Sequence, residues 1–189
     1  MESALIVSSS EASITFFNDM LSAASIGPAA VAGSCAQARR LMLARDFDLV
    51  IVNAPLRDET GEVLAREVAS GAEGQVILVV KAELFDALSA ACEEDGVLTV
   101  ARPVNRHVFW SALKLAKAAH NRLSRMRRDI RGLMKKIEDI RVVDRAKCLL
   151  ISYLGIGEAE AHRYIEKQAM DTRETKRAVA ESILKMYEP

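Results

Sequence analysis

Apolar residues recur at alternating spacings of three and four along one stretch of the chain. They follow a heptad repeat and are Ala116, Ala119, Leu123, Met126, Ile130, Leu133, Ile137 and Ile140. Because this apolar seam is only two residues wide, it is too narrow to bury a helix in a globular core, and it suits pairing with a second copy. The pattern predicts a coiled coil over residues 119–140 that forms a parallel homodimer. Its dimer seam is formed by Leu123, Met126, Ile130, Leu133, Ile137 and Ile140.

Before the seam, short β-branched runs alternate with helical segments. We expect strands at residues 4–7, 28–32, 50–52, 76–80 and 97–100, and helices at 11–24, 35–44, 61–69 and 83–93. Ser34 and Thr60 are expected helix caps. The helix after Pro103 should pack its first turns on the sheet. Five βα units of this length predict an α/β domain of the flavodoxin-like kind over residues 1–118, with any site at the carboxyl ends of its strands.

After the seam, the pattern changes on the same helix. The next two heptad positions are Asp144 and Lys147, so pairing should stop near residue 140, and a rotated apolar stripe takes over. Glycines at 155 and 157 should end the helix. A second helix opens at Glu158, with Tyr164 expected on its buried face, and Thr172 is the expected N-cap of a third. Residues 141–189 therefore predict a small three-helix bundle.

The first domain resembles a response-regulator receiver domain, on the order of its elements and on Pro55 and Pro103. The resemblance implies phosphorylation on a carboxylate at the end of the third strand and Mg²⁺ held by an acidic pair. The matching pocket here is degenerate. Asn53 replaces the phosphoacceptor, serines including Ser9 replace the acidic pair, Lys81 replaces a hydroxyl residue, and Arg102 replaces a lysine. An amide cannot form an acyl phosphate, so phosphotransfer at this position is not expected.

Two interpretations of this degenerate pocket stay open. In the first, it is a scaffold remnant, and Lys81 and Arg102 reach solvent or satisfy strand-end carbonyls. In the second, these cations and the neighbouring hydroxyls bind a small anion or hold the domain in its active arrangement. Under both interpretations the domain is a binding module, which has room for a regulatory protein partner.

The last domain closely resembles the ANTAR domain. The resemblance rests on Arg145-Ala-Lys147, on Glu158-Ala-Glu-Ala-His162-Arg-Tyr, on Ala169-Met170-Asp, and on the basic start of the last helix. It covers nearly all of residues 141–187. It implies an RNA-binding transcription antitermination regulator that stabilises tandem hairpins in nascent leader transcripts. The candidate RNA-binding residues are Lys147, His162, Arg163, Lys167, Arg173, Lys176 and Arg177, whose side chains can meet phosphates or stack on loop bases.

The distribution of charge agrees with a polyanionic partner. The whole chain is neutral, yet residues 1–103 carry 15 acidic and 7 basic side chains, and residues 104–189 carry 11 acidic and 19 basic ones. Two other functions remain as alternatives. One is a protein-interaction scaffold with an acidic receiver-like domain, and the other is a regulator that binds double-stranded DNA, which would need a major-groove helix.

Catalytic, metal and cofactor chemistry is not expected. The three histidines are far apart, and no phosphate-binding glycine motif occurs. The carboxylates around Asp58 read best as solvated loop charges. Three distant cysteines without a CxxC pair suggest a reduced compartment. The chain has no apolar run long enough to span a membrane and begins without a signal-peptide pattern. We therefore expect a cytoplasmic protein that is not an enzyme.

Overall fold

The computed structural model describes residues 1–71 and 74–187. The chain forms two compact units, Met1–Ser124 and Arg125–Pro189. The long helix α5 (Arg106–Leu154) supplies its first turns to one unit and its last turns to the other. The sequence divides this region at 118 and 140 instead, and the coiled-coil segment between those residues stays a prediction.

The first unit is built on a five-stranded parallel sheet of order β2-β1-β3-β4-β5. The strands are β1 (Ala4–Val7), β2 (Ala30–Ala32), β3 (Leu49–Asn53), β4 (Gln75–Lys81) and β5 (Leu98–Arg102). The connecting helices are α1 (Glu11–Ala23), α2 (Cys35–Ala44), α3 (Glu62–Ser70), the 3₁₀ turn η1 (Ala82–Leu84) and α4 (Phe85–Cys92). This strand order is the flavodoxin-like one, so the expected fold class is confirmed.

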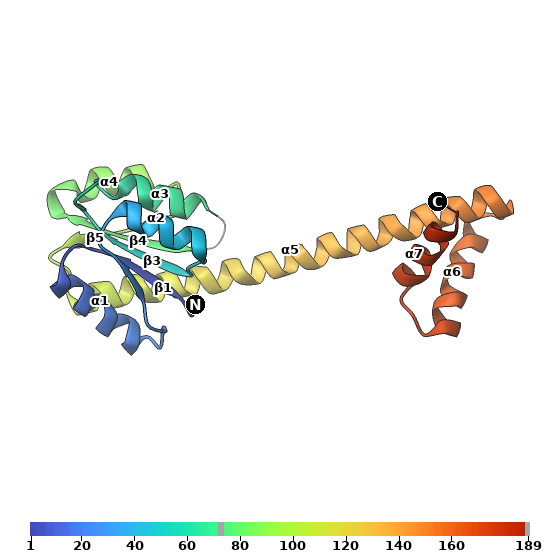
Figure 1. Cartoon of the computed structure of the whole chain (residues 1–189), viewed down its shortest axis with the longest axis horizontal. Helices are drawn as coiled ribbons and strands as arrows, with labels where there is room; N and C mark the ends of the chain where they lie inside the picture. The colour runs from blue at the N-terminus through green and yellow to red at the C-terminus, as the bar shows by residue number, and fades with distance from the viewer. Residues whose placement is uncertain (72–73, 188–189) are drawn as a thin grey trace. The chain divides into compact units, whose positions relative to one another are not determined.

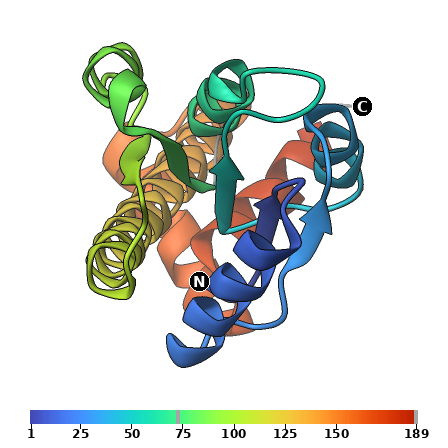
Figure 2. The same ribbon diagram turned by 90° about the vertical axis from the view of Figure 1, so that its left-hand side faces the viewer.

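Two hydrophobic cores lie on opposite faces of this sheet. Side chains alternate along each strand, so that Leu5 joins the core beneath α2, α3 and α4, and Ile6 joins the core beneath α1 and α5 (Figures 1 and 2). Phe109 and Leu113 of α5 are fully buried in the second core, as the sequence predicts. The parallel strands are covered by helices on both faces, which explains their continuous β-branched runs.

The helix starts show where local sequence patterns succeed and fail. Ser34 caps α2 as expected, since its hydroxyl accepts a hydrogen bond from the backbone N–H of residue 37. Thr60 is not the cap of α3: that position is Gly61, whose φ of 88° favours glycine. Thr172 is not a cap either, because it lies inside α6 and its hydroxyl donates to the carbonyl of Gln168.

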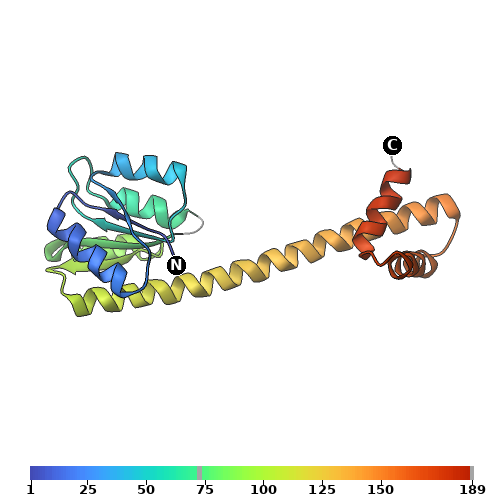
Figure 3. The same cartoon turned by 60° about the horizontal axis from the view of Figure 1, so that its bottom comes forward.

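The second unit packs the last turns of α5 against α6 (Glu158–Thr172) and α7 (Lys176–Tyr187) (Figure 3). Gly155, with φ of 66°, ends α5 as the sequence predicts. Thr175 caps α7 through a 3.2 Å hydrogen bond from the backbone N–H of residue 178. Small and branched side chains fill the core of the bundle, which consists of Ala146, Leu150, Ala161, Ile165, Ala169, Val179, Ala180 and Ile183.

Within the part of the chain that the structure describes, no helix combines the length and the apolar character needed to cross a membrane.

Candidate nucleic-acid interface

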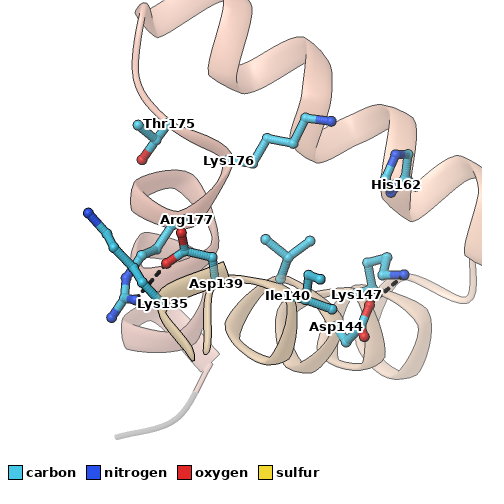
Figure 4. Close-up of a pocket in the computed structure, with 10 residues that line it drawn as sticks. Lys135, Asp139, Ile140, Asp144, Lys147, His162, Thr175, Lys176 and Arg177 are labelled. Atoms are coloured by element: carbon cyan, nitrogen blue, oxygen red, sulfur yellow. Dashed lines mark hydrogen bonds and ion pairs between the residues drawn. The ribbon is translucent and has the colours of Figure 1, made fainter. Parts of the chain in front are cut away.

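A groove of about 460 Å³ opens on the second unit, bordered by α5 and by the helices α6 and α7 (Figure 4). Ile140 and Val143 of α5 give it an apolar surface. The other lining residues are Lys135, Asp139, Asp144, Lys147, His162, Thr175, Lys176 and Arg177. Four of the seven candidate RNA-binding residues therefore border one groove, although they come from three helices and span thirty residues of sequence.

Ion pairs between helices engage three of these four residues. Lys147 of α5 contacts Asp144 at 2.8 Å and Glu158 of α6 at 3.2 Å. Arg177 of α7 contacts Asp139 of α5 at 2.7 Å. The pair with Asp144 lies within α5, and the other two pairs link α5 to α6 and α7. They give the two cations a structural role beside any role in binding.

Lys176 links α7 to α6. Its ammonium pairs with Glu166 of α6, which also lies 3.2 Å from the Nε2 atom of His162. The Lys176 ammonium holds the pKa of the Glu166 carboxyl below its usual range, with a smaller contribution from His162. Hydrogen bonds to Asp144 and then Glu158 raise the pKa of Lys147. Lys147, Lys176 and Arg177 therefore each already have a carboxylate partner.

The other three candidate residues lie outside the groove. Arg163 and Lys167 are exposed on α6, where the Nε of Arg163 donates to the carbonyl of Ala159 at 3.2 Å. Arg173 is the exposed C-cap of α6, in the left-handed region with φ of 57°. None of the three forms an ion pair among the described residues. The candidate residues thus divide into a paired set at the groove and an unpaired set on and after α6.

Tyr164 does not lie in the core, contrary to the expectation from its spacing. Its side chain is 43% exposed beside Arg163 on α6, while Ala161 and Ile165 fill the core positions. The helix turns about 100° per residue, so Tyr164 shares its exposed face with Lys167. An exposed tyrosine next to cations is a group on which an unpaired base can stack.

Sequence reasoning also missed several groove residues. Thr175 falls inside the third helix that an N-cap at Thr172 predicts, and Lys135 and Asp139 fall at polar positions of the predicted coiled coil. Lys135 and Asp139 are four residues apart on one helix face, so their proximity is readable from the sequence. Their closeness to α7 depends on the tertiary packing of the bundle and gives no local signal.

The six seam residues are exposed in the single chain. Their exposed fractions range from 39% at Leu123 to 59% at Ile140. A row of large apolar side chains with this exposure is the surface that a coiled-coil partner covers. Homodimerisation itself stays a prediction.

Side chains of the degenerate pocket in the receiver-like domain form hydrogen bonds within that domain, beside a cavity of about 220 Å³ that Asn53 and Arg102 line. Asn53 is buried, and its Nδ2 donates to the hydroxyl of Ser8 at 3.0 Å. The Arg102 guanidinium donates to the carbonyl of Ala54, the carbonyl contact foreseen for a scaffold remnant. Lys81 and Ser9 are exposed. The contact of Arg102 with Ala54 is the one expected of a scaffold remnant, and both interpretations of the pocket stay predictions.

A second cluster of chemical groups has a structural explanation. The Cys35 sulfur and carboxylate oxygens of Asp58 and Glu59 lie within 4.8 Å of one another. Both carboxylate oxygens of Asp58 accept backbone N–H groups at the start of α2, chiefly that of Ala36, and these bonds lower the pKa of Asp58. Glu59 pairs with Arg39. Burial raises the pKa of the Cys35 thiol to about 11. These carboxylates are structural rather than merely solvated charges.

Comparison with known proteins identifies the second unit. Residues 131–184 match the ANTAR domain. The chain carries an ANTAR domain. The match begins inside α5 and includes all of α6 and the groove residues of α7. The resemblance drawn from the sequence motifs is therefore confirmed.

Two relatives extend the likeness toward the first unit. The transcriptional regulatory protein PdtaR of Mycobacterium tuberculosis is 26% identical over 137 residues, which cover 72% of this chain and 67% of the relative. The aliphatic amidase regulator of Pseudomonas aeruginosa is 24% identical over 123 residues, or 65% of this chain and 63% of the relative. Both names are those of regulators rather than enzymes.

Solved structures match the fold of the first unit. The signal receiver domain of an HD domain-containing protein from Pseudomonas fluorescens has a TM-score of 0.57 at 22% identity, covering 67% of this chain and 92% of that one. A response regulator receiver domain from Clostridium thermocellum has a TM-score of 0.57 at 17% identity, covering 65% and 99%. The ANTAR domain is therefore preceded by a domain of receiver-like fold.

Proposed function

We propose that this chain is an RNA-binding transcription antitermination regulator. It acts as a homodimer whose two ANTAR domains stabilise tandem hairpins in a nascent leader transcript, so that an overlapping terminator cannot form. Two domains and two hairpins match in number, so pairing through the dimer seam supplies one ANTAR domain for each hairpin. Phosphorylation of the receiver-like domain is not part of this function.

One observation supports RNA binding more than any other. The groove of the ANTAR domain brings Lys147, His162 and Lys176 together from three different helices. The side chains of Lys176 and Glu166 are both substantially exposed, so an RNA phosphate can replace this carboxylate partner at little cost. Beside the groove, Arg163 and Lys167 offer cations without carboxylate partners, and Tyr164 offers an exposed ring.

The receiver-like domain then acts as the regulatory module. Its pocket lacks the phosphoacceptor carboxylate, and Asn53 is held by Ser8 in the buried interior. The signal therefore reaches the domain by another route, for which a protein partner on its acidic surface is the simplest candidate. The protein works in the cytoplasm, where nascent transcripts are made.

Binding to a leader RNA that contains two adjacent hairpins tests the proposal. The affinity in a gel shift should fall steeply as the salt concentration rises, since phosphate contacts release counterions. Duplex DNA of equal length should fail to displace the RNA. Preferential binding of duplex DNA would favour the DNA-regulator alternative instead. A protein that binds no such RNA and purifies free of nucleic acid would favour the interaction scaffold.

A further inference from the structure

The strongest positive charge of the second unit lies on α5 rather than in the three-helix bundle. Residues 125–136 contain six basic side chains and one acidic one, Asp129. Residues 141–189 contain nine basic and eight acidic side chains, so the bundle is nearly neutral. The ANTAR domain match begins only at residue 131. Half of this basic segment therefore lies before the region that the family defines.

Four of the six cations of this segment are available to a ligand. Arg125, Arg131, Lys135 and Lys136 are exposed and form no ion pair among the described residues. This separates them from Lys147, Lys176 and Arg177, each of which already holds a carboxylate. Phosphates that bind along α5 do not need to displace an acidic partner.

The heptad frame places these cations beside the dimer seam and not in it. With Leu123 and Ile130 at position a, Arg125 lies at c, Arg131 at b and Lys135 at f. Side chains at b, c and f point away from the partner helix of a coiled coil. Arg125, Arg131 and Lys135 consequently stay accessible when two copies pair, whereas Lys136, at position g, borders the seam.

The spacing of the charges suits a nucleic-acid backbone. Twelve helical residues extend over about 17 Å at a rise of about 1.5 Å per residue. A strand of duplex DNA carries one phosphate about every 3.4 Å along its axis, so on the order of five phosphates fit beside such a segment. Four cations that form no ion pair among the described residues, with Asp129 as the single acidic residue of the segment, match a continuous phosphate backbone better than a protein surface of mixed charge.

We infer that the basic segment of α5, residues 125–136, is a second RNA-contact surface that holds the phosphate backbone of the transcript. This inference rests on the proposed RNA binding and adds a surface outside the bundle. The bundle contacts the hairpin loops, and α5 contributes affinity that is independent of base sequence. The phosphate contacts of α5 therefore add to the salt dependence of binding separately from the contacts of the bundle.

A charge-neutralising variant tests this assignment. The full-length double variant Arg125→Gln and Arg131→Gln removes two cations at outward positions, so the dimer mass in light scattering should not change. The matched control, Arg40→Gln and Arg57→Gln, removes two exposed cations of the receiver-like domain. Affinity for a leader RNA with two adjacent hairpins is measured by fluorescence anisotropy over a series of KCl concentrations. Because two chains bind one RNA, the α5 variant removes four cations from the complex, and the slope of log affinity against log salt should become shallower by about 2.8–3.6. The slope should stay unchanged in the control.

The possible results separate this inference from the proposed function. Equal slopes in the wild type and the α5 variant would overturn the inference and leave the proposed function intact. Equal changes in the α5 variant and the control would also overturn it, because the effect would then follow net charge alone. A wild-type protein that binds no RNA would overturn both. Circular dichroism verifies that both variants are folded.

Discussion

Carboxylate partners decide how much each candidate cation can contribute to RNA binding. Lys147 is the most enclosed of them, with its side chain 14% exposed between Asp144 and Glu158. Lys167 is exposed on the outer face of α6 and has no carboxylate partner among the described residues. A cation of the first kind stabilises the bundle before it meets a ligand, whereas a cation of the second kind is free to bind phosphate.

Substitution of these two lysines should therefore give different results. Lys147→Ala removes a link between α5 and α6, and amide hydrogen exchange at the start of α6 should become a few-fold faster. Lys167→Ala should leave hydrogen exchange unchanged and weaken RNA binding several-fold. Equal exchange rates in both variants, together with equal RNA affinity, would show that the division into paired and unpaired cations is wrong.

Asn53 gives a prediction about the receiver-like domain. Incubation of the protein with acetyl phosphate and Mg²⁺ should not raise its mass by a phosphoryl group. The variant Asn53→Asp should also stay unmodified, because serines still occupy the positions of the Mg²⁺ ligands. A mass increase in the variant alone would show that a single carboxylate restores the chemistry, and an increase in the wild type would contradict phosphorylation independence.

The individual residues of the site were only partly predictable. Lys147, His162 and Lys176 could be selected from motif resemblance and charge, and the structure brings them to one groove. Their carboxylate partners could not be selected. Glu158 lies 11 residues from Lys147, and that contact exists only once α6 folds back on α5. Tyr164 was misplaced because the apolar spacing allows either it or its neighbour to face the core.

At the scale of elements, α5 combines an apolar seam, which favours pairing, with basic residues beside the seam, which oppose it. Its seam is apolar enough to pair, yet four of the six positions that flank the seam from 122 to 141 carry basic side chains. In a parallel dimer, Arg122 at g would face Arg127 at e of the other copy, and Lys136 would face Arg141 in the same way. Such pairs oppose association at low salt.

Dimerisation and RNA binding should consequently respond to salt in opposite directions. Added KCl screens the like charges and should strengthen the dimer, whereas it should weaken RNA binding. Analytical ultracentrifugation of the free protein measures the first effect. Ile137→Asp should abolish the dimer, and Met134→Asp, at an exposed apolar residue of the same turn outside the seam, should weaken it less. A dimer that dissociates as salt rises, or one that tolerates Ile137→Asp, would contradict the parallel pairing.

The start of a helix was predictable where only one nearby residue is of a type that forms an N-cap. Ser34 has both the residue type and the position of an N-cap, and the structure uses it. Near α7, two threonines three residues apart satisfied the same rule, and the packing of Ile165 and Ala169 keeps α6 helical past the first of them. Thr175 is therefore the cap, a choice that depends on the bundle core rather than on the local sequence.

At the scale of the whole molecule, the sequence separates an acidic receiver-like domain from a basic helix and an ANTAR domain. The parallel fold was predictable because buried strands and amphipathic helices alternate regularly. The ANTAR domain was predictable because residues that match its motif occur throughout all three helices. The cations that are proposed to contact RNA were harder to predict from the sequence, because they depend on which basic side chains the folded chain leaves without carboxylate partners.

The stoichiometry of the RNA complex tests the central claim most directly. Full-length protein is mixed with a leader RNA of two adjacent hairpins, and the mass of the complex is measured by native mass spectrometry beside a gel shift at several salt concentrations. We predict two protein chains on one two-hairpin RNA, with much weaker binding when either hairpin is deleted. Binding of one chain to each hairpin with equal affinity in the single-hairpin RNAs, or no binding at all, would contradict the account.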